Sequence, residues 1–433
     1  MSLASRIEQG PVSRFQVTAI SICMVINMLD GFDVLVVAFT APSIAADWDL
    51  SATAVGSLLS AGLIGMTFGS LLLGPLADRF GRRPLVLAAL VVISIGMLLS
   101  AFTMDLNQLF VTRLLTGLGV GAMLPSLNTI VSEYSSLRWR SFAVSFLQAG
   151  YPVGATVGGI LAAVLISHYG WRWVYLAAGL ASTAMIFVAW RQLPESLDHV
   201  LTHRPANALG KVNRMLARLG QPAISELPPL HAKLAQKSGY ADLLASPALL
   251  RTTALLCAAF MVVMLSFYFV LSWTPKLLVD AGMSASQGIS GGIILNMGGI
   301  VGSLLLGYIS SRVPISKLIA LYMLVTAVLM AFFASVSAFN TGMLVLTLAL
   351  GFFIFGSMVG LYALAPHLYP ASSRAAGLSV AIGVGRLGGV LSPLLAGYLF
   401  DHGWNRQDGF IAFAAPLLVS VIVVLVLGRS VRR

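Results

Sequence analysis

Two aspartates, Asp30 and Asp33, lie three residues apart inside the first long apolar segment of the chain. On a helix this spacing places both side chains on one face, with Asn27 one turn before Asp30. If the segment crosses a bilayer, each ionised carboxylate costs roughly 2.5–3.5 kcal/mol. Burial and a second nearby carboxylate both favour the neutral form of such a group. The pair therefore predicts a proton-coupling site, with a permanent ion pair to an arginine in another apolar segment as the alternative.

Two arginines, Arg113 and Arg386, also lie within apolar segments. A guanidinium offers a planar fork of donors that matches a carboxylate. Arg386 is therefore predicted to dock an anionic substrate, assisted by Arg113, and a structural pair or packing role is the alternative. The segment around Arg386 contains Gly-x-Gly-x-x-Gly, but a dinucleotide-binding loop must join a strand to a helix. We exclude that reading because this run lies inside an apolar segment.

Further polar and aromatic groups lie inside the apolar segments and complete the predicted substrate site. They are Asn27, Gln148, Tyr151, Tyr268, Asn296 and Tyr362. A lining of amides and aromatic rings suits a flat organic anion, although packing explains each aromatic residue equally well on its own. His199 and His203 have helical metal-ligand spacing, but no third ligand is close in the sequence. We therefore predict no metal site.

The composition is that of a polytopic membrane protein. Hydrophobic residues make up 58% of the 433 residues and charged residues 9%, whereas a soluble domain carries about 25% charged residues. A helix needs about 20 apolar residues to span a bilayer. Twelve such segments are predicted, at about 16–39, 52–74, 84–103, 107–130, 141–167, 172–192, 248–273, 288–311, 316–337, 342–366, 374–399 and 408–428. Their apolar runs are continuous rather than alternating, so the expected fold is all-α.

The net charge of +11 is a signal of topology rather than of nucleic-acid binding. When the loops are assigned alternately to two sides, most of the 26 Lys and Arg residues fall on the side that holds both termini. Only Arg172, Lys276 and Arg406 fall on the other side. Because cytoplasmic loops carry the excess of Lys and Arg, both termini are predicted to be cytoplasmic.

One long polar loop divides the chain into two sets of six helices. The predicted parts are a cytoplasmic tail at 1–15, a bundle at 16–192, a cytoplasmic loop at 193–247, a second bundle at 248–428 and a tail at 429–433. Within the loop, 211–218 is either a short amphipathic helix on the membrane surface or part of a solvated linker. A repeated six-helix unit with a site near the midplane is a recurrent plan of secondary transporters.

The loop at 74–83 carries the most specific motif, Gly-x-x-x-Asp-Arg-x-Gly-Arg-Arg. It resembles the signature of the major facilitator superfamily between helices 2 and 3. A weaker copy follows the eighth segment, with Ser311 and Pro314 at the positions of Asp78 and Gly81. The residues predicted to act in gating are Gly74, Asp78, Arg79, Gly81, Arg82, Glu133, Arg138 and Arg374.

Within that superfamily the chain resembles the bacterial aromatic acid:proton symporters, on the residues 29–33, 74–83, 113–121, 132–134, 272–275 and 383–386. The resemblance implies a monomer in the bacterial cytoplasmic membrane that imports hydroxybenzoate- or protocatechuate-like acids with protons, by alternating access. It also implies functional importance for Asp30, Asp33 and Asp78. Protons serve as the coupling ion, and no other cofactor is expected.

Two other classes of function were weighed against symport. A glycine- and proline-rich run at 150–159 resembles that of antiporters, so an exporter of drugs or metabolites is the alternative transporter. An enzyme would need a nucleophile and base, or a metal set, at one depth, and none is apparent. We therefore predict that the chain is not an enzyme.

Overall fold

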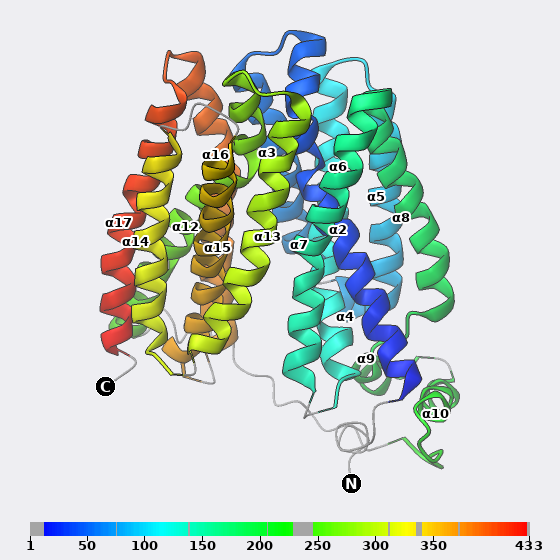
Figure 1. The fold of residues 1–433 in the computed structure, drawn as a ribbon. Coiled ribbons are helices and arrows are strands. Elements are labelled where there is room, and N and C mark those ends of the chain that lie inside the picture. The colour runs from blue at the N-terminus through cyan, green and yellow to red at the C-terminus, as the bar shows by residue number, and fades with distance from the viewer. Residues whose placement is uncertain are drawn as a thin grey trace. The chain divides into compact units, whose positions relative to one another are not determined.

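The computed structural model describes residues 13–74, 76–136, 139–205, 207–227, 246–310, 312–334, 340–370 and 373–430. Secondary structure in these ranges is helical, and no strand occurs among them (Figure 1). Twelve helices in these ranges are long and apolar enough to cross a membrane, which confirms the predicted fold class. The first and seventh helices extend past their predicted apolar runs, to Trp48 and Asp280, because helical hydrogen bonding continues into polar residues.

The spanning helices of the first part of the chain are separated by short turns. They are α2 (Arg14–Trp48), α3 (Ala52–Phe68) with the π-helical turn η1 (Gly69–Leu73), α5 (Arg82–Ala101), α6 (Leu106–Glu133), α7 (Arg140–Tyr169) and α8 (Arg172–Gln192). The short helix α4 (Leu76–Phe80) lies in the loop before α5. Capping explains some of the starts: Asp105 accepts a hydrogen bond from the Gln108 amide at 2.9 Å and so begins α6.

The remaining spanning helices follow the central loop. They are α12 (Pro247–Asp280), α13 (Ala285–Ser310), α14 (Ile315–Ala334), α15 (Thr341–Leu364) with the 3-10 turn η2 (Ala365–Leu368), α16 (Arg374–Asp401) and α17 (Arg406–Ser430). The side chain of Asn340 accepts a hydrogen bond from the Met343 amide at 2.9 Å and begins α15.

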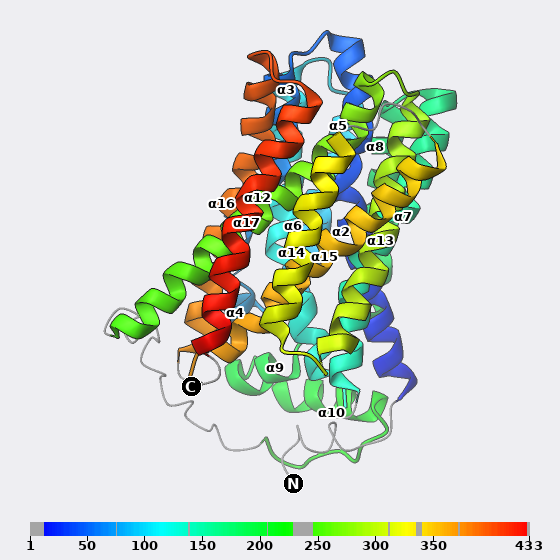
Figure 2. The same ribbon diagram turned by 60° about the vertical axis from the view of Figure 1, so that its left-hand side comes forward.

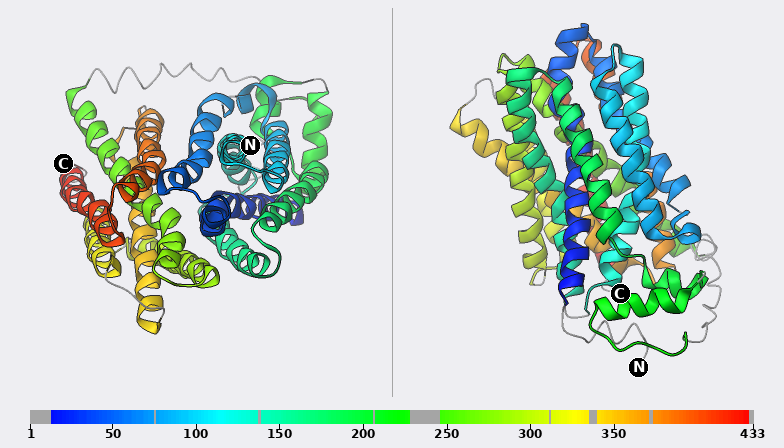
Figure 3. Two further views of the ribbon diagram at one scale, coloured as in Figure 1. Left: turned by 90° about the horizontal axis from the view of Figure 1, so that it is seen from above. Right: turned by 90° about the vertical axis from the view of Figure 1, so that its right-hand side faces the viewer.

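The described residues group into two compact units. Unit 1 is drawn from Met1–Val34, Ile64–Ala155 and Tyr175–Lys233, and unit 2 from Leu35–Leu63, Thr156–Val174 and Leu234–Arg433. Within each unit the axes of the spanning helices are roughly aligned, and in the view from above many of them are seen obliquely (Figure 3). The predicted division at 193–247 into two six-helix halves stays a prediction.

Close backbone contact joins α3, η1 and α6 within unit 1. A Cβ atom added at Gly121 would lie 2.0 Å from the Met66 carbonyl oxygen, and one at Gly65 would lie 2.2 Å from that of Leu114. A Cβ atom added at Gly69 would lie 2.1 Å from the Leu118 carbonyl oxygen. The glycine-rich run in 113–121 thus allows close packing, because side chains here would force the helices apart.

In unit 2 close backbone contact at glycines joins α13 to α15. A Cβ atom at Gly302 would lie 2.0 Å from the Phe352 carbonyl oxygen, and one at Gly351 would lie 1.9 Å from that of Leu295. Beside this contact, Tyr322 of α14 stacks on Phe352 with ring centroids 5.6 Å apart. These contacts build the interior of unit 2 from backbone approach and aromatic packing, since lipid gives no hydrophobic force between helices.

Two short helices, α9 (Leu197–His203) and α10 (Ala208–Arg218), belong to unit 1 and lie across the direction of the spanning helices (Figure 2). The apolar side of α10 is covered by protein: Val212 and Leu216 are both 0% exposed. Of the two alternatives for 211–218, the structure shows the helix, and its apolar face is buried against protein rather than exposed to lipid. Burial against protein removes the same apolar area from water.

Candidate functional site

The aspartate cluster lies in α2, within unit 1. Asp30 is 2% exposed and Asp33 is 5% exposed. Neither carboxylate oxygen of Asp33 has a hydrogen-bond partner among the described residues. Asn27 is fully buried and its amide donates a hydrogen bond to the Leu147 carbonyl oxygen of α7 at 2.6 Å. Asn27 thus ties α2 to α7, and Asp33 remains a buried carboxylate without hydrogen bonds to any described residue.

The helix turn that carries the aspartates is pressed against the backbone of α7. A Cβ atom at Gly31 would lie 2.0 Å from the Tyr151 carbonyl oxygen, and one at Gly154 would lie 1.8 Å from that of Met28. Gly31 thus serves close packing and does not break the helix, because α2 continues through this position.

Arg113 of α6 supplies the positive charge near the aspartates. It is 2% exposed and interacts electrostatically with Asp33, which in turn interacts with Asp30. The Nη2 atom of Arg113 donates hydrogen bonds to the hydroxyls of Ser100 at 3.0 Å and Thr116 at 2.9 Å. Its guanidinium also lies over the ring of Tyr175, 4.9 Å from the centroid.

These contacts fix Arg113 among neutral groups. Neither Asp33 oxygen accepts a hydrogen bond from it, and its Nε atom is buried without a hydrogen-bond partner among the residues that the structure describes. The arrangement gives Arg113 a fixed position in the field of the carboxylates. Its predicted direct contact with substrate stays a prediction.

Two other predicted substrate residues, Gln148 and Tyr151, lie on α7. Gln148 is exposed, and its Nε2 atom lies 3.5 Å from the Oδ1 atom of Asn128 on α6. Tyr151 is half-buried, and its backbone is the one that Gly31 contacts. Both residues belong to unit 1, as do the aspartates.

In unit 2 the structure brings Arg386 of α16 together with two predicted aromatic residues. Arg386 and Tyr268 both interact electrostatically with Tyr362 of α15. The ring of Tyr362, which is 38% exposed, meets Phe260 of α12 edge-on with centroids 5.2 Å apart. The Tyr268 ring packs on Gly389, where a Cβ atom would lie 2.8 Å from it. The cluster is a half-buried guanidinium beside tyrosine rings.

Asn296, the remaining predicted substrate residue, is fully buried in α13. Its amide donates a hydrogen bond to the Gly292 carbonyl oxygen of the same helix at 2.8 Å. Its Oδ1 atom is buried without a hydrogen-bond partner among the described residues, and its predicted contact with substrate stays a prediction.

The predicted gating loop is organised around Gly81 and Glu195, an acid of the central loop. Gly81 has a φ of +105°, a conformation that favours glycine, and it leads directly into α5. The Oε1 atom of Glu195 accepts hydrogen bonds from the amides of Arg82 at 2.8 Å and Arg83 at 3.2 Å. A Cβ atom at Gly81 would lie 2.5 Å from the Oε2 atom of Glu195.

The other predicted gating residues have different surroundings. Arg82 donates a hydrogen bond to the Ala77 carbonyl oxygen at 3.2 Å, and Arg79 lies over the ring of Phe80, 5.3 Å from its centroid. The nearest atom to a Cβ added at Gly74 is the carbonyl oxygen of Ser70, one turn earlier, at 2.5 Å. Asp78 lies in α4 and Arg374 begins α16, whereas Arg138 lies outside the described residues.

Glu133 holds the start of α9. Its two carboxylate oxygens accept hydrogen bonds from the Ser196 hydroxyl and the Leu197 amide, each at 2.9 Å. The phenol of Tyr134 donates to the Glu195 carbonyl oxygen at 2.7 Å, and burial raises the pKa of Tyr134, so the phenol stays protonated and remains a donor. Glu133 and Glu195 thus bind two helix starts to the C-terminal end of α6.

The sequence carried one signal for this arrangement. Ser196 stands where a helix N-cap is expected, and its hydroxyl accepts a hydrogen bond from the His199 amide at 3.1 Å. A preceding acid beside a capped helix is a candidate for a contact with another helix start. Its partners, however, lie more than 100 residues earlier in the chain.

Comparison with known proteins gives consistent results. Residues 23–364 match the family profile described as Major Facilitator Superfamily. The chain is 32% identical to a gallate transporter of Pseudomonas putida, over 98% of this chain and 94% of the relative. It is 31% identical to a 4-hydroxybenzoate transporter of the same organism, over 99% and 96% of the two chains. It is also 31% identical to a 3-(3-hydroxy-phenyl)propionate transporter of Escherichia coli, over 98% and 97%.

Among solved structures, the inward-open xylose transporter of E. coli is similar to this chain with a TM-score of 0.73. The match covers 95% of this chain and 96% of that protein at 17% identity. At this identity the similarity concerns the fold.

Proposed function

Because the chain belongs to the Major Facilitator Superfamily of membrane transporters, we propose that it imports aromatic carboxylates together with protons. The observation that carries this proposal is the position of Arg386 beside Tyr362 in unit 2. A guanidinium offers parallel donors to a carboxylate, and a tyrosine offers a flat face or edge to an aromatic ring. Gallate and 4-hydroxybenzoate, after which two relatives are named, each combine a ring with a carboxylate.

The proposed proton site is the aspartate pair of unit 1. An ionised carboxylate that is buried without hydrogen bonds is costly, and a bound proton removes its charge. Asp33 is such a group, since neither of its oxygens has a hydrogen-bond partner among the described residues. With both aspartates ionised, their charges exceed that of Arg113 by one negative charge. Uptake of a single proton therefore makes the cluster neutral.

The proposed cycle is alternating access. A proton binds at Asp30 or Asp33 and neutralises the excess negative charge of unit 1. The substrate carboxylate docks on Arg386 and neutralises its positive charge in unit 2, and the site then closes. Neutral groups cross a low-dielectric environment at smaller cost than charged ones. One proton per monoanion makes the cycle electroneutral, and a second proton would add about 2.3 kcal/mol per 100 mV of membrane potential.

Uptake of labelled 4-hydroxybenzoate into vesicles containing the purified chain tests the proposal. With the outside made acidic, we expect accumulation above the outside concentration, and without a pH gradient we expect equilibration only. If accumulation requires the opposite gradient, with the lumen acidic, the chain is an antiporter and the symport proposal is wrong.

Asp33→Asn separates coupling from substrate binding. Asparagine resembles a permanently neutral carboxyl group, so we expect the variant to lose accumulation driven by the pH gradient and to keep exchange of labelled for unlabelled substrate. Asp49→Asn is the matched control, because Asp49 is exposed and has a φ of +48° that asparagine also tolerates. Accumulation by Asp33→Asn at the level of the control would show that Asp33 does not carry the coupling proton.

Arg386→Gln tests the carboxylate dock. Loss of one charged hydrogen-bonding partner costs about 1.5–3 kcal/mol, so the concentration for half-maximal exchange is expected to rise by at least about tenfold. Arg251→Gln is the control because Arg251 is exposed in α12. Equal affinities in the two variants would remove Arg386 from the site.

We further propose that both termini lie in the cytoplasm of a bacterial cell and that the chain functions as a monomer of two six-helix halves. The excess of Lys and Arg on one set of loops supports the orientation. A cysteine introduced as Glu226→Cys should react with an impermeant maleimide in inside-out vesicles and not in intact cells. The reverse pattern would invert the topology.

A further inference from the structure

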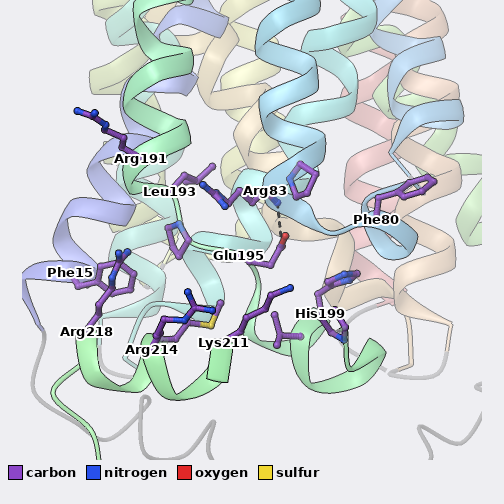
Figure 4. A pocket seen from close by; sticks show the side chains of 15 residues that line it. Phe15, Phe80, Arg83, Arg191, Leu193, Glu195, His199, Lys211, Arg214 and Arg218 are labelled. Atoms are coloured by element: carbon purple, nitrogen blue, oxygen red, sulfur yellow. Dashed lines mark hydrogen bonds between the residues drawn. The ribbon is translucent and has the colours of Figure 1, made fainter. Parts of the chain in front are cut away.

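Unit 1 contains a basic pocket that the proposed transport cycle does not use. The pocket has a volume of about 450 Å³ and lies between Phe80, the start of α5, the end of α8 and the helices α9 and α10 (Figure 4). Five cationic side chains line it: Arg83, Arg191, Lys211, Arg214 and Arg218. Glu195 is the one acid among the lining residues.

The charge of Glu195 is already engaged by backbone donors. Its Oε1 atom accepts hydrogen bonds from the Arg82 and Arg83 amides and from the Ser196 amide, the last at 2.8 Å. These contacts compensate the positive end of α5 rather than the cationic side chains. The pocket therefore has a net positive charge.

Arg83 lies at the inner wall of the pocket with part of its guanidinium engaged. Its Nη2 atom donates a hydrogen bond to the Trp190 carbonyl oxygen at the end of α8. Its Nε atom is buried and has no hydrogen-bond partner among the described residues. Arg83 thus places at the wall of the pocket a guanidinium that has one donor still unpaired within the described part of the chain.

Helix α10 presents three further cations on one face. Lys211, Arg214 and Arg218 are spaced three and four residues apart, which aligns them along a helix. Figure 4 shows Lys211 and Arg214 extending from α10 toward the side of the pocket where Arg83 and Glu195 lie, whereas the guanidinium of Arg218 lies over the ring of Phe15, 5.5 Å from its centroid. Like charges at this spacing destabilise a helix unless an anion lies between them. The buried Val212 and Leu216 hold α10 in this orientation.

We propose that this pocket binds a phosphate group. A phosphate offers several strong acceptor oxygens and up to two negative charges, so it can engage several cations at once, whereas a carboxylate suits a single arginine. The pocket is larger than a phosphate ion. Phe80, Leu193 and Met215 add apolar surface that a larger molecule bearing the phosphate could contact. The molecule that bears the phosphate is either an anionic phospholipid or a soluble phosphorylated compound. Basic clusters next to spanning helices attract anionic headgroups, which makes a phospholipid one of the two sources.

Thermal unfolding of the full chain in neutral detergent tests this proposal with three probes: dihexanoyl phosphatidylglycerol, dihexanoyl phosphatidylcholine and inorganic phosphate. We expect saturable stabilisation by phosphatidylglycerol, by phosphate or by both, and none by phosphatidylcholine. A response to phosphatidylglycerol alone identifies lipid as the source of the phosphate. A response to inorganic phosphate in the same concentration range identifies a soluble compound.

The variant Lys211→Gln with Arg214→Gln locates the effect. Both side chains are exposed at the pocket and neither packs in the interior, so the unliganded melting temperature is expected to stay the same or to rise slightly as the repulsion between them is removed. The half-saturating concentration should rise about tenfold or more, because each cation near the anion contributes about 1 kcal/mol. Arg251→Gln with Lys317→Gln removes the same charge from exposed positions outside the pocket. No stabilisation by either anionic probe, or equal binding by the two double variants, would overturn the proposal.

Discussion

Replacement of Glu195 tests whether the contact at the start of α5 stabilises unit 1. The Oε1 atom of Glu195 accepts three backbone hydrogen bonds, from Arg82 at 2.8 Å, Arg83 at 3.2 Å and Ser196 at 2.8 Å. A hydrogen bond to a charged group contributes about 1.5–3 kcal/mol, and bonds that share one acceptor do not add fully. Glu195 is also partly exposed, which lowers the value further. We therefore expect Glu195→Ala to cost about 3 kcal/mol.

Glu195→Gln separates the charge from the hydrogen bonds. Glutamine keeps one acceptor oxygen but loses the favourable interaction with the positive helix end, which contributes about 0.3–1 kcal/mol. The expected order of stability is wild type, then Gln, then Ala, with a loss of about 1 kcal/mol for Gln. In a chain of this size, the Ala variant is expected to lower the apparent melting temperature by roughly 3–6 °C.

The local assay is hydrogen exchange of the peptide that covers the first turn of α5. A loss of about 3 kcal/mol corresponds to more than about a hundredfold faster exchange if these amides exchange by local opening of the contact. The controls are Glu226→Ala and Glu226→Gln, because Glu226 is an exposed acid of the same loop. If Glu195→Ala exchanges and melts like Glu226→Ala, the contact does not stabilise the loop and our reasoning is wrong.

Two further predictions concern helix contacts. Gly31→Ala places a Cβ atom 2.0 Å from the Tyr151 carbonyl oxygen, so it should lower stability by about 1–3 kcal/mol, whereas Gly62→Ala meets no atom within 4 Å and should be neutral or stabilising. Equal melting temperatures for the two variants would contradict the close contact of α2 and α7. The carboxylate of Asp401 accepts hydrogen bonds from the first two amides of α3, each at 2.8 Å, so Asp401→Ala should cost about 1 kcal/mol in thermal unfolding. Unchanged protection of those amides in hydrogen exchange would argue against this cap.

The spanning helices could be predicted because a continuous apolar run of sufficient length crosses lipid as an α-helix, which satisfies its own backbone hydrogen bonds. The glycine run of α6 could also be predicted to pack, since small residues are the general means of close helix approach in membranes. The surroundings of Arg113 could not be derived in this way. Its hydroxyl partners, Ser100 and Thr116, are common residue types with no pattern that marks them as ligands of a guanidinium.

The central loop shows the same limit. Its sequence left a basic amphipathic helix and a solvated linker as alternatives, and the structure shows the helix α10. Whether its apolar face meets lipid or protein depends on the shape of the surface beneath it. A pattern along one helix does not contain that shape.

By itself the sequence determined that the chain is all-α, that it crosses a membrane repeatedly, and that carboxylates and guanidiniums are buried in its helices. These properties follow from composition and periodicity, which are local. Only the tertiary structure decided that Asp33 has no hydrogen-bond partner among the described residues, that Arg386 lies beside Tyr362, and that Glu195 binds the start of α5. Each of these depends on the close approach of groups distant in the chain, and side-chain hydrogen bonds act only over about 3 Å.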